Sequence, residues 1–285
     1  MDVEAVALPV LTDSPVLTDA DLVEIVRGGS AGKHTAIAER AAVSETVSDA
    51  LISHADEQAV AALMGNAGAE IGEASLDKAI SRFEHSDVVK SSMVRRPKLP
   101  VTIAERLMVT VSERMQEWLM SHHDLPATLV ADVMLQSRER ATLSLSYGSN
   151  VHALERLLKQ MHRHGRLTPL LVLRAICIGD MAFFEAAMAV LAGIPVLNAR
   201  ILIEDAGSKG FASLYQKTGM PLRLMTAFKV AVEVVSGTAF DGGERDLERY
   251  RSRVIARILT QFEDLPQDDL DYLLDKLSDV LGAAA

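Results

Sequence analysis

The sequence is poor in cysteine, in aromatic residues and in the patterns that build β-strands. Only one of its 285 residues is a cysteine, Cys177, so no disulfide can form within the chain, and a reducing compartment suits it. Cys177 stands in the apolar run Ala-Ile-Cys-Ile, which predicts a small core side chain rather than a nucleophile. Aromatic residues make up 4% of the chain, and long runs of Val, Ile and Thr bounded by turns are absent. The remaining composition, 49% hydrophobic and rich in Ala, Leu and Val, favours close helix packing and an all-α fold.

Positive charge is also scarce. The formal net charge of −10 opposes general affinity for phosphate backbones and for anionic lipid. Residues 1–10 contain two acids and no base, which argues against a signal peptide. The most apolar long segment, residues 181–203, is interrupted by polar residues and a proline, namely Glu185, Pro195, Asn198 and Arg200. It therefore predicts two buried helices instead of a membrane span, and we expect a cytoplasmic protein.

An apolar residue followed by serine, glycine or proline recurs along the chain at nearly constant intervals. The first four of these junctions are Val43-Ser44, Ile71-Gly72, Leu99-Pro100 and Leu125-Pro126, at intervals of 28, 28 and 26 residues. Further along, Pro169, Pro195 and Pro221 are spaced 26 apart. Apolar residues recur four and eight positions after most junctions, a pattern that predicts one buried helical stripe. A unit of this length holds two short helices and cannot bury its own apolar face, so it must stack on its neighbours.

These units predict an all-α, right-handed α-solenoid of about eight helical hairpins. Residues 1–16, which are weakly patterned and contain Pro9 and Pro15, are expected to form a flexible N-terminal arm. Residues 17–265 form the helical-repeat array, and residues 266–285 form a capping helix with leucines on one side and aspartates on the other. The spacing of two long units also indicates an internal duplication that relates residues 99–166 to residues 194–264.

Several junction sequences resemble those of one protein family. They are Arg40…Val43, Asn66-Ala67-Gly68-Ala69-Glu70-Ile71, Arg96-Pro97-Lys98-Leu99-Pro100, and residues 167–220 with Gly179-Asp180-Met181-Ala182-Phe183-Phe184. On these motifs the chain resembles an alphaproteobacterial helical-repeat family known only as a domain of unknown function, with an architecture similar to HEAT repeats. The resemblance covers residues 17–221. It implies HEAT-like hairpins and no catalytic residues.

One stretch is similar to a phosphate-binding loop. Residues 28–35 read Gly-Gly-Ser-Ala-Gly-Lys-His-Thr, but the glycines are one residue too close, and His34 separates Lys33 from Thr35. A helix start also lies upstream, where such a loop needs a strand. We therefore interpret the stretch as a helix-to-helix turn.

The histidines and the single tryptophan have structural explanations as well. His122-His123-Asp124 and His162-Arg163-His164 lie at helix ends, where bases complement the helix dipole, and adjacent helical side chains diverge too far to share a metal ion. Trp118 fits a core stripe with its neighbours at helical spacing, which predicts packing. No catalytic, cofactor-binding or metal-binding residues are predicted, and the chain is not expected to be an enzyme.

Two rows of basic residues are the strongest functional candidates. Arg245, Arg249, Arg253 and Arg257 recur every four residues and share one helical face, long enough to bind an acidic peptide or a row of phosphates. Arg156, Lys159 and Arg163 form a similar, shorter row in the other long unit. The alternative is that both rows are solvated and paired within their own helices, because acids lie three or four positions from several of the arginines.

The sequence therefore predicts a non-enzymatic scaffold or adaptor that binds a protein or peptide, acidic in character, on the surface of the helical array. The alternative is a nucleic-acid-binding repeat protein that uses the Arg-rich helix over residues 244–262, which the low aromatic content and the net charge disfavour. Apolar stripes left uncovered at the ends of the stack also favour a homodimer.

Overall fold

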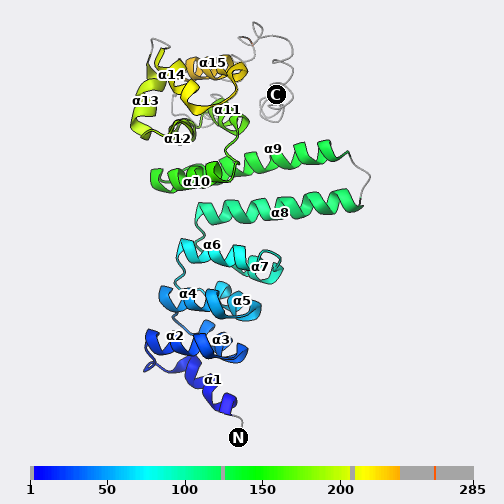
Figure 1. Cartoon of the computed structure of the whole chain (residues 1–285), viewed down its shortest axis with the longest axis vertical. Helices are drawn as coiled ribbons and strands as arrows, with labels where there is room; N and C mark the ends of the chain where they lie inside the picture. The colour runs from blue at the N-terminus through cyan, green and yellow to red at the C-terminus, as the bar shows by residue number, and fades with distance from the viewer. Residues whose placement is uncertain (1–2, 123–125, 206–208, 238–259, 261–285) are drawn as a thin grey trace, which may run out of the picture. The chain divides into compact units, whose positions relative to one another are not determined.

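The computed structural model describes residues 3–122, 126–205, 209–237 and 260. Over these residues it contains fifteen α-helices and one short 3-10 helix, with no β-strand, which confirms the predicted all-α fold. The chain divides into two compact units, residues 1–111 and residues 112–285, with the boundary inside one long helix. Figure 1 labels the helices in both units.

Unit 1 is built from short helices in two alternating rows. Its helices are α1 (Val3–Asp13), α2 (Asp19–Gly28), α3 (Ala31–Ala38), α4 (Glu45–His54), α5 (Glu57–Gly65), α6 (Glu73–Arg82), α7 (Asp87–Val94) and the first half of α8 (Val101–His122). Helices α1, α3, α5 and α7 contact one another in sequence, and α2, α4 and α6 do the same. The apolar core between the rows is centred on fully buried Ile37, Leu51, Leu63 and Met64.

Each predicted junction in unit 1 is the start of a helix. α4, α6 and α8 begin one to two residues after Val43-Ser44, Ile71-Gly72 and Leu99-Pro100. The Ser44 hydroxyl accepts a hydrogen bond from the backbone N–H of Val47, so it satisfies a donor that the first turn of α4 leaves unpaired. The local capping chemistry therefore sets the starts that the sequence period indicates.

Ion pairs between neighbouring helical repeats of unit 1 recur with the same period. Lys78 of α6 lies 3.5 Å from the carboxylate of Asp49 on α4. Arg106 of α8 forms the corresponding ion pair with Asp77 on α6. Both partners shift by 28 residues from one pair to the next, which matches the first two junction intervals in the sequence.

Three residues of the motifs that carry the family resemblance fasten each junction to the preceding one. The Arg40 guanidinium donates to the backbone carbonyl of Ser14 at 2.7 Å. The Asn66 amide donates to the carbonyls of Ala38 and Arg40, each at 2.8 Å. Arg96 donates to three carbonyls at the end of α5 and in the turn beyond it. The Ala38 and Met64 carbonyls lie in the last turn of a helix, where they have no intrahelical donor, so Asn66 and Arg96 act as C-terminal caps supplied from the next repeat.

Most of residues 1–16, the predicted flexible N-terminal arm, is helical. Residues 3–13 form α1, which includes Pro9 and packs on α3. Leu11 is buried in the core of unit 1, and Arg40 donates to the Leu11 carbonyl near the end of α1. The local sequence pattern does not indicate this helix, because contacts with distant residues stabilise it.

Unit 2 is built around α12. After the second half of α8 come α9 (Ala127–Ser146), α10 (Val151–Arg163), α11 (Pro169–Cys177), α12 (Met181–Ala192), α13 (Val196–Glu204), α14 (Lys209–Thr218), the 3-10 helix η1 (Leu222–Leu224) and α15 (Met225–Ser236). Helix α12 contacts α10, α11, α13 and α14. The ring centre of its Phe184 lies 6.1 Å from that of Phe228 on α15, and the ring centres of Phe228 and Tyr215 on α14 are 5.4 Å apart. Pro126, Pro195 and Pro221 again directly precede helix starts, and Pro169 is the first residue of α11.

Residues 99–125 do not form the predicted pair of short helices. The described part of this predicted repeat contains the single helix α8, because residues 101–122 contain no glycine or proline that would end a helix. In the proposed duplication, the stretch that corresponds to α8 holds two helices, α13 and α14. The predicted capping helix at 266–285 and the end of the second copy lie outside the described residues.

Candidate interaction surfaces

Helix α10 separates its apolar and polar residues sharply. Asn150 begins the helix by accepting a hydrogen bond from the backbone N–H of Ala153 at 2.9 Å. Leu154, Leu157 and Leu158 are buried, and the helix packs on α12 through this side. The opposite side of α10 faces solvent.

The three predicted basic residues of α10 share this solvent side. Arg156, Lys159 and Arg163 are exposed and follow one another at spacings of three and four residues. Lys159 donates to the Glu155 carboxylate at 2.7 Å, and this contact lowers the pKa of Glu155. The Arg163 Nε–H donates weakly to the Lys159 carbonyl, at 3.4 Å. His152 and His162 are also exposed, so five basic or titratable nitrogen groups line the face with one carboxylate.

The chain's acidic balance is unevenly distributed. Residues 1–94 contain sixteen Asp or Glu and six Lys or Arg, a net formal charge of −10. Residues 138–237 contain twelve Lys or Arg and seven Asp or Glu, a net of +5. The basic face of α10 therefore belongs to a basic stretch of the chain. The other predicted row, Arg245, Arg249, Arg253 and Arg257, lies outside the described residues.

A second surface is apolar. Trp118, which the sequence assigned to the core, is 50% exposed on the second half of α8, so that prediction is wrong. Its indole ring stacks on the imidazole of His122 at 4.8 Å between ring centres. Met115 and Met120 on α8, and Leu129 and Val133 on α9, are exposed as well. The helical spacing is present, as predicted, but the described part of the chain does not cover this face.

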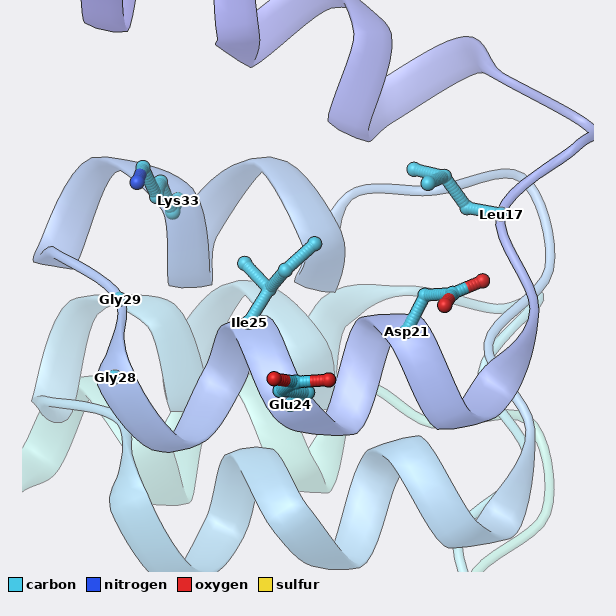
Figure 2. A pocket seen from close by; sticks show the side chains of 7 residues that line it. All are labelled: Leu17, Asp21, Glu24, Ile25, Gly28, Gly29 and Lys33. Atoms are coloured by element: carbon cyan, nitrogen blue, oxygen red, sulfur yellow. The ribbon is translucent and has the colours of Figure 1, made fainter.

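A third feature is a groove of about 460 Å³ along α2 and the start of α3 (Figure 2). It is lined by Leu17, Asp21, Glu24, Ile25, Gly28, Gly29 and Lys33. Figure 2 shows Ile25 near the centre, with Leu17 toward one end and Lys33 toward the other.

This groove lies at the stretch that is similar to a phosphate-binding loop. Residues 28–30 join helix α2 to helix α3, which confirms the predicted helix-to-helix turn. A side chain at position 29 would meet the Ile25 carbonyl at 2.5 Å, so Gly29 allows close backbone approach within the turn. Asp21 and Glu24 also line the groove, and two carboxylates disfavour a phosphate group.

Cys177, the single cysteine, lies in the apolar core of unit 2. Burial raises the pKa of the Cys177 thiol to about 12, as expected for an inert core cysteine. Within the described residues, no three His, Cys, Asp or Glu side chains gather in a way that could hold a metal ion. Among the same residues no single helix is both long and apolar enough to cross a membrane, although α12 and α13 meet the criterion together as a pair bent by 110°.

The family assignment follows from the length of the sequence match. Residues 6–266 match a family described as an uncharacterised protein conserved in bacteria (DUF2336). The chain belongs to this family. DUF2336 is a bacterial domain of unknown function, as the junction motifs indicated, and the match extends beyond the 17–221 stretch that carried the resemblance. No curated protein and no solved structure matches the chain significantly.

Proposed function

We propose that this DUF2336 protein is a non-enzymatic protein-binding scaffold, a HEAT-like right-handed α-solenoid that recognises an acidic segment of a partner. The basic face of α10 is the primary contact surface. A preformed helix offers its charged side chains at little ordering cost, so the binding energy is not spent on folding the site.

The arrangement of unit 1 supports the solenoid part of the proposal. Alternate helices contact one another in two rows, and ion pairs recur at 28-residue spacing. Repeats that contact only their neighbours build an extended surface whose main use in known repeat proteins is binding. The step from this architecture to binding is an analogy, and the charge of α10 makes it specific.

The single observation that carries the partner's chemistry is the exposed row Arg156, Lys159 and Arg163 within a basic stretch of an acidic protein. Arginine and lysine at successive turns match carboxylates spaced along an extended or helical peptide. The intrahelical Glu155–Lys159 pair does not remove this match, because exposed pairs of this kind contribute little and exchange readily.

The test compares two triple charge reversals of equal net charge. One variant carries Arg156→Glu, Lys159→Glu and Arg163→Glu on α10. The control carries glutamate at Lys209, Lys217 and Lys229, which are also exposed in unit 2. The probe is a fluorescein-labelled peptide of alternating glutamate and glycine, followed by fluorescence anisotropy at about 50 mM salt, where surface electrostatics are strong. We expect at least a tenfold loss of affinity in the α10 variant and less than threefold in the control.

Equal losses in the two variants would show that overall charge, and not the α10 face, governs binding. A labelled single-stranded DNA and a duplex of the same length are measured alongside. Tighter binding to either nucleic acid, with a steep dependence on salt, would replace the protein-scaffold proposal by the nucleic-acid alternative. A third variant, with Arg249→Glu and Arg253→Glu, tests the second basic row in the same assay, and unchanged affinity would exclude that row.

A further inference from the structure

Helices α2, α4 and α6 form one row of unit 1, and each begins after a capping residue. These caps are Thr18, Ser44 and Gly72. In α6, the third, sixth and tenth residues after the cap all donate hydrogen bonds to the preceding row helix, α4. Ser75 and Lys78 donate to the Asp49 carboxylate at 3.1 and 3.5 Å, and Arg82 donates to the Ile52 carbonyl at 2.6 Å. These positions therefore mark the side of a row helix that faces its predecessor.

The same three positions in α2 are Asp21, Glu24 and Gly28, and all of them line the groove along α2. Helix α2 is the first of its row among the described residues, because α1 belongs to the other row and packs on α3. Figure 2 shows Ile25 projecting from the middle of α2. Ile25 is only partly buried, whereas Ala79, its equivalent in α6, is fully buried. The groove is therefore the place of a preceding row helix, which no described helix fills.

The charges of this groove select bases. Two hydrogen bonds from Thr18, at 2.6 and 2.9 Å, lower the pKa of Asp21, so its carboxylate stays ionised. Glu24 is exposed and forms no ion pair with any described residue. The row helices of this chain offer their successors carboxylates, those of Asp49 and Asp77. Like charges therefore oppose such a helix from a second copy, and a helix with lysines or arginines complements the groove.

Lys33, at the other end of the groove, indicates the direction of the bound helix. Row helices of unit 1 run parallel, because Thr102 and Arg106 of α8 contact residues four apart in α6 in the same order. Arg82 bonds a carbonyl in the last turn of the preceding helix α4. A helix parallel to α2 would end beside Lys33, which can donate to its last carbonyls in the same way.

We propose that the α2 groove binds a basic amphipathic helix of a partner protein, parallel to α2 and in the place of a preceding row helix. Its apolar side packs on Leu17 and Ile25, its bases face Asp21 and Glu24, and its last turn lies at Lys33. Because α4 and α6 have 10 residues each, we expect a helix of about the same length. This site takes bases in unit 1, whereas the α10 face takes acids in unit 2, so either proposal can fail without the other.

The probe is a fluorescein-labelled peptide of about 14 residues, built from alanine, leucine and lysine, with the leucines on one helical face. Its binding to the full-length chain is followed by fluorescence anisotropy at about 150 mM salt, which screens general attraction to an acidic unit. A scrambled peptide of the same composition and a peptide with glutamate for lysine are the controls. We expect the wild type to bind the amphipathic probe at least about tenfold more tightly than either control.

Two glycines give a matched pair of blocking variants. Gly28 and Gly65 each end a helix, and a Cβ added at either position meets no atom within 4 Å. Gly28→Trp fills the groove and should weaken probe binding at least about tenfold, whereas Gly65→Trp lies outside it and should change binding less than about threefold. Glu24→Lys should weaken binding about tenfold, and Glu39→Lys, at an exposed position outside the groove, less than about threefold.

Equal losses in the two tryptophan variants, or equal affinity for the scrambled peptide, would overturn the proposal, and so would a probe that does not bind at about 100 µM protein. Circular dichroism checks that each variant keeps its helicity. If Gly28→Trp unfolds, the comparison of Glu24→Lys with Glu39→Lys decides. Sedimentation equilibrium tests the other occupant, because a wild-type dimer that Gly28→Trp dissociates would assign the groove to a second copy and overturn the partner helix.

Discussion

The buried ion pair between α9 and α11 gives the sharpest test of what holds unit 2 together. Arg174 Nε lies 3.2 Å from Glu139 Oε2, and the two side chains are 2% and 6% exposed. The other carboxylate oxygen accepts a hydrogen bond from the Thr168 hydroxyl at 2.7 Å. Thr168 in turn caps α11 by accepting from the backbone N–H of Leu171. The Glu139 carboxylate therefore connects α9 to both the start and the interior of α11.

Replacing Glu139 by leucine should destabilise unit 2 by about 3–5 kcal/mol, because it removes a carboxylate that pairs with the buried Arg174 charge. Adding Arg174→Met removes the second charge, and the double variant should recover to within about 1 kcal/mol of the wild type or exceed it. The matched surface control is Lys159→Ala, which breaks an exposed pair and should cost no more than about 0.5 kcal/mol.

The assay is urea unfolding followed by far-ultraviolet circular dichroism, with hydrogen exchange of the α11 amides to assign the transition to unit 2. The four variants of the double-mutant cycle give the coupling between Glu139 and Arg174 directly. A single Glu139→Leu variant that loses less than about 1 kcal/mol would refute the reasoning, because the cost of an uncompensated buried charge would then be absent.

Two further predictions concern a thiol and a cap. The raised pKa of Cys177 keeps its thiol neutral in the folded state, so its reaction with a disulfide reagent at pH 8 should be at least about 100-fold slower than in urea. The unfolded thiol ionises near 9.0 and the folded one near 12, so the stability that this group contributes is present below pH 9 and lost as the pH rises toward 12. Arg96→Met should lower the free energy of unfolding of unit 1 by about 2–3 kcal/mol, since three carbonyls lose a charged donor. Arg96→Lys should recover less than half of this loss in thermal unfolding, because an ammonium lacks the forked geometry.

The helix starts were predictable because they depend on local chemistry. Serine or proline at the start of a unit either caps the first turn or occupies a position where its missing N–H has no partner. Ser44 and Thr168 accept hydrogen bonds from backbone N–H groups of the first turns of α4 and α11, and Pro169 begins α11. These interactions span three residues, so sequence spacing alone locates them.

The features that sequence reasoning missed depend on contacts between distant residues. α1 is ordered through Leu11 and Arg40, which are 29 residues apart, and nothing near Pro9 signals that contact. The helical period around Trp118 was correct, but a period alone does not tell whether the face that it defines is buried. The uneven charge was visible in the sequence, and only the average over the whole chain concealed it.

The two halves of α8 differ in how much of their surface is buried. In its first half, Arg106 forms an ion pair with α6 and Ile103 and Leu107 are buried, so this half is held by its own chain. The buried residues of α8 end at Val109, and the thirteen residues that follow include Met115 and Trp118 with half their surface in water. Most helical stability in proteins comes from packing an apolar face, and isolated helices of about 12–15 residues are marginal in water. Among the described residues, the apolar face of the second half of α8 therefore stays half exposed, and packing stabilises this half less than the first.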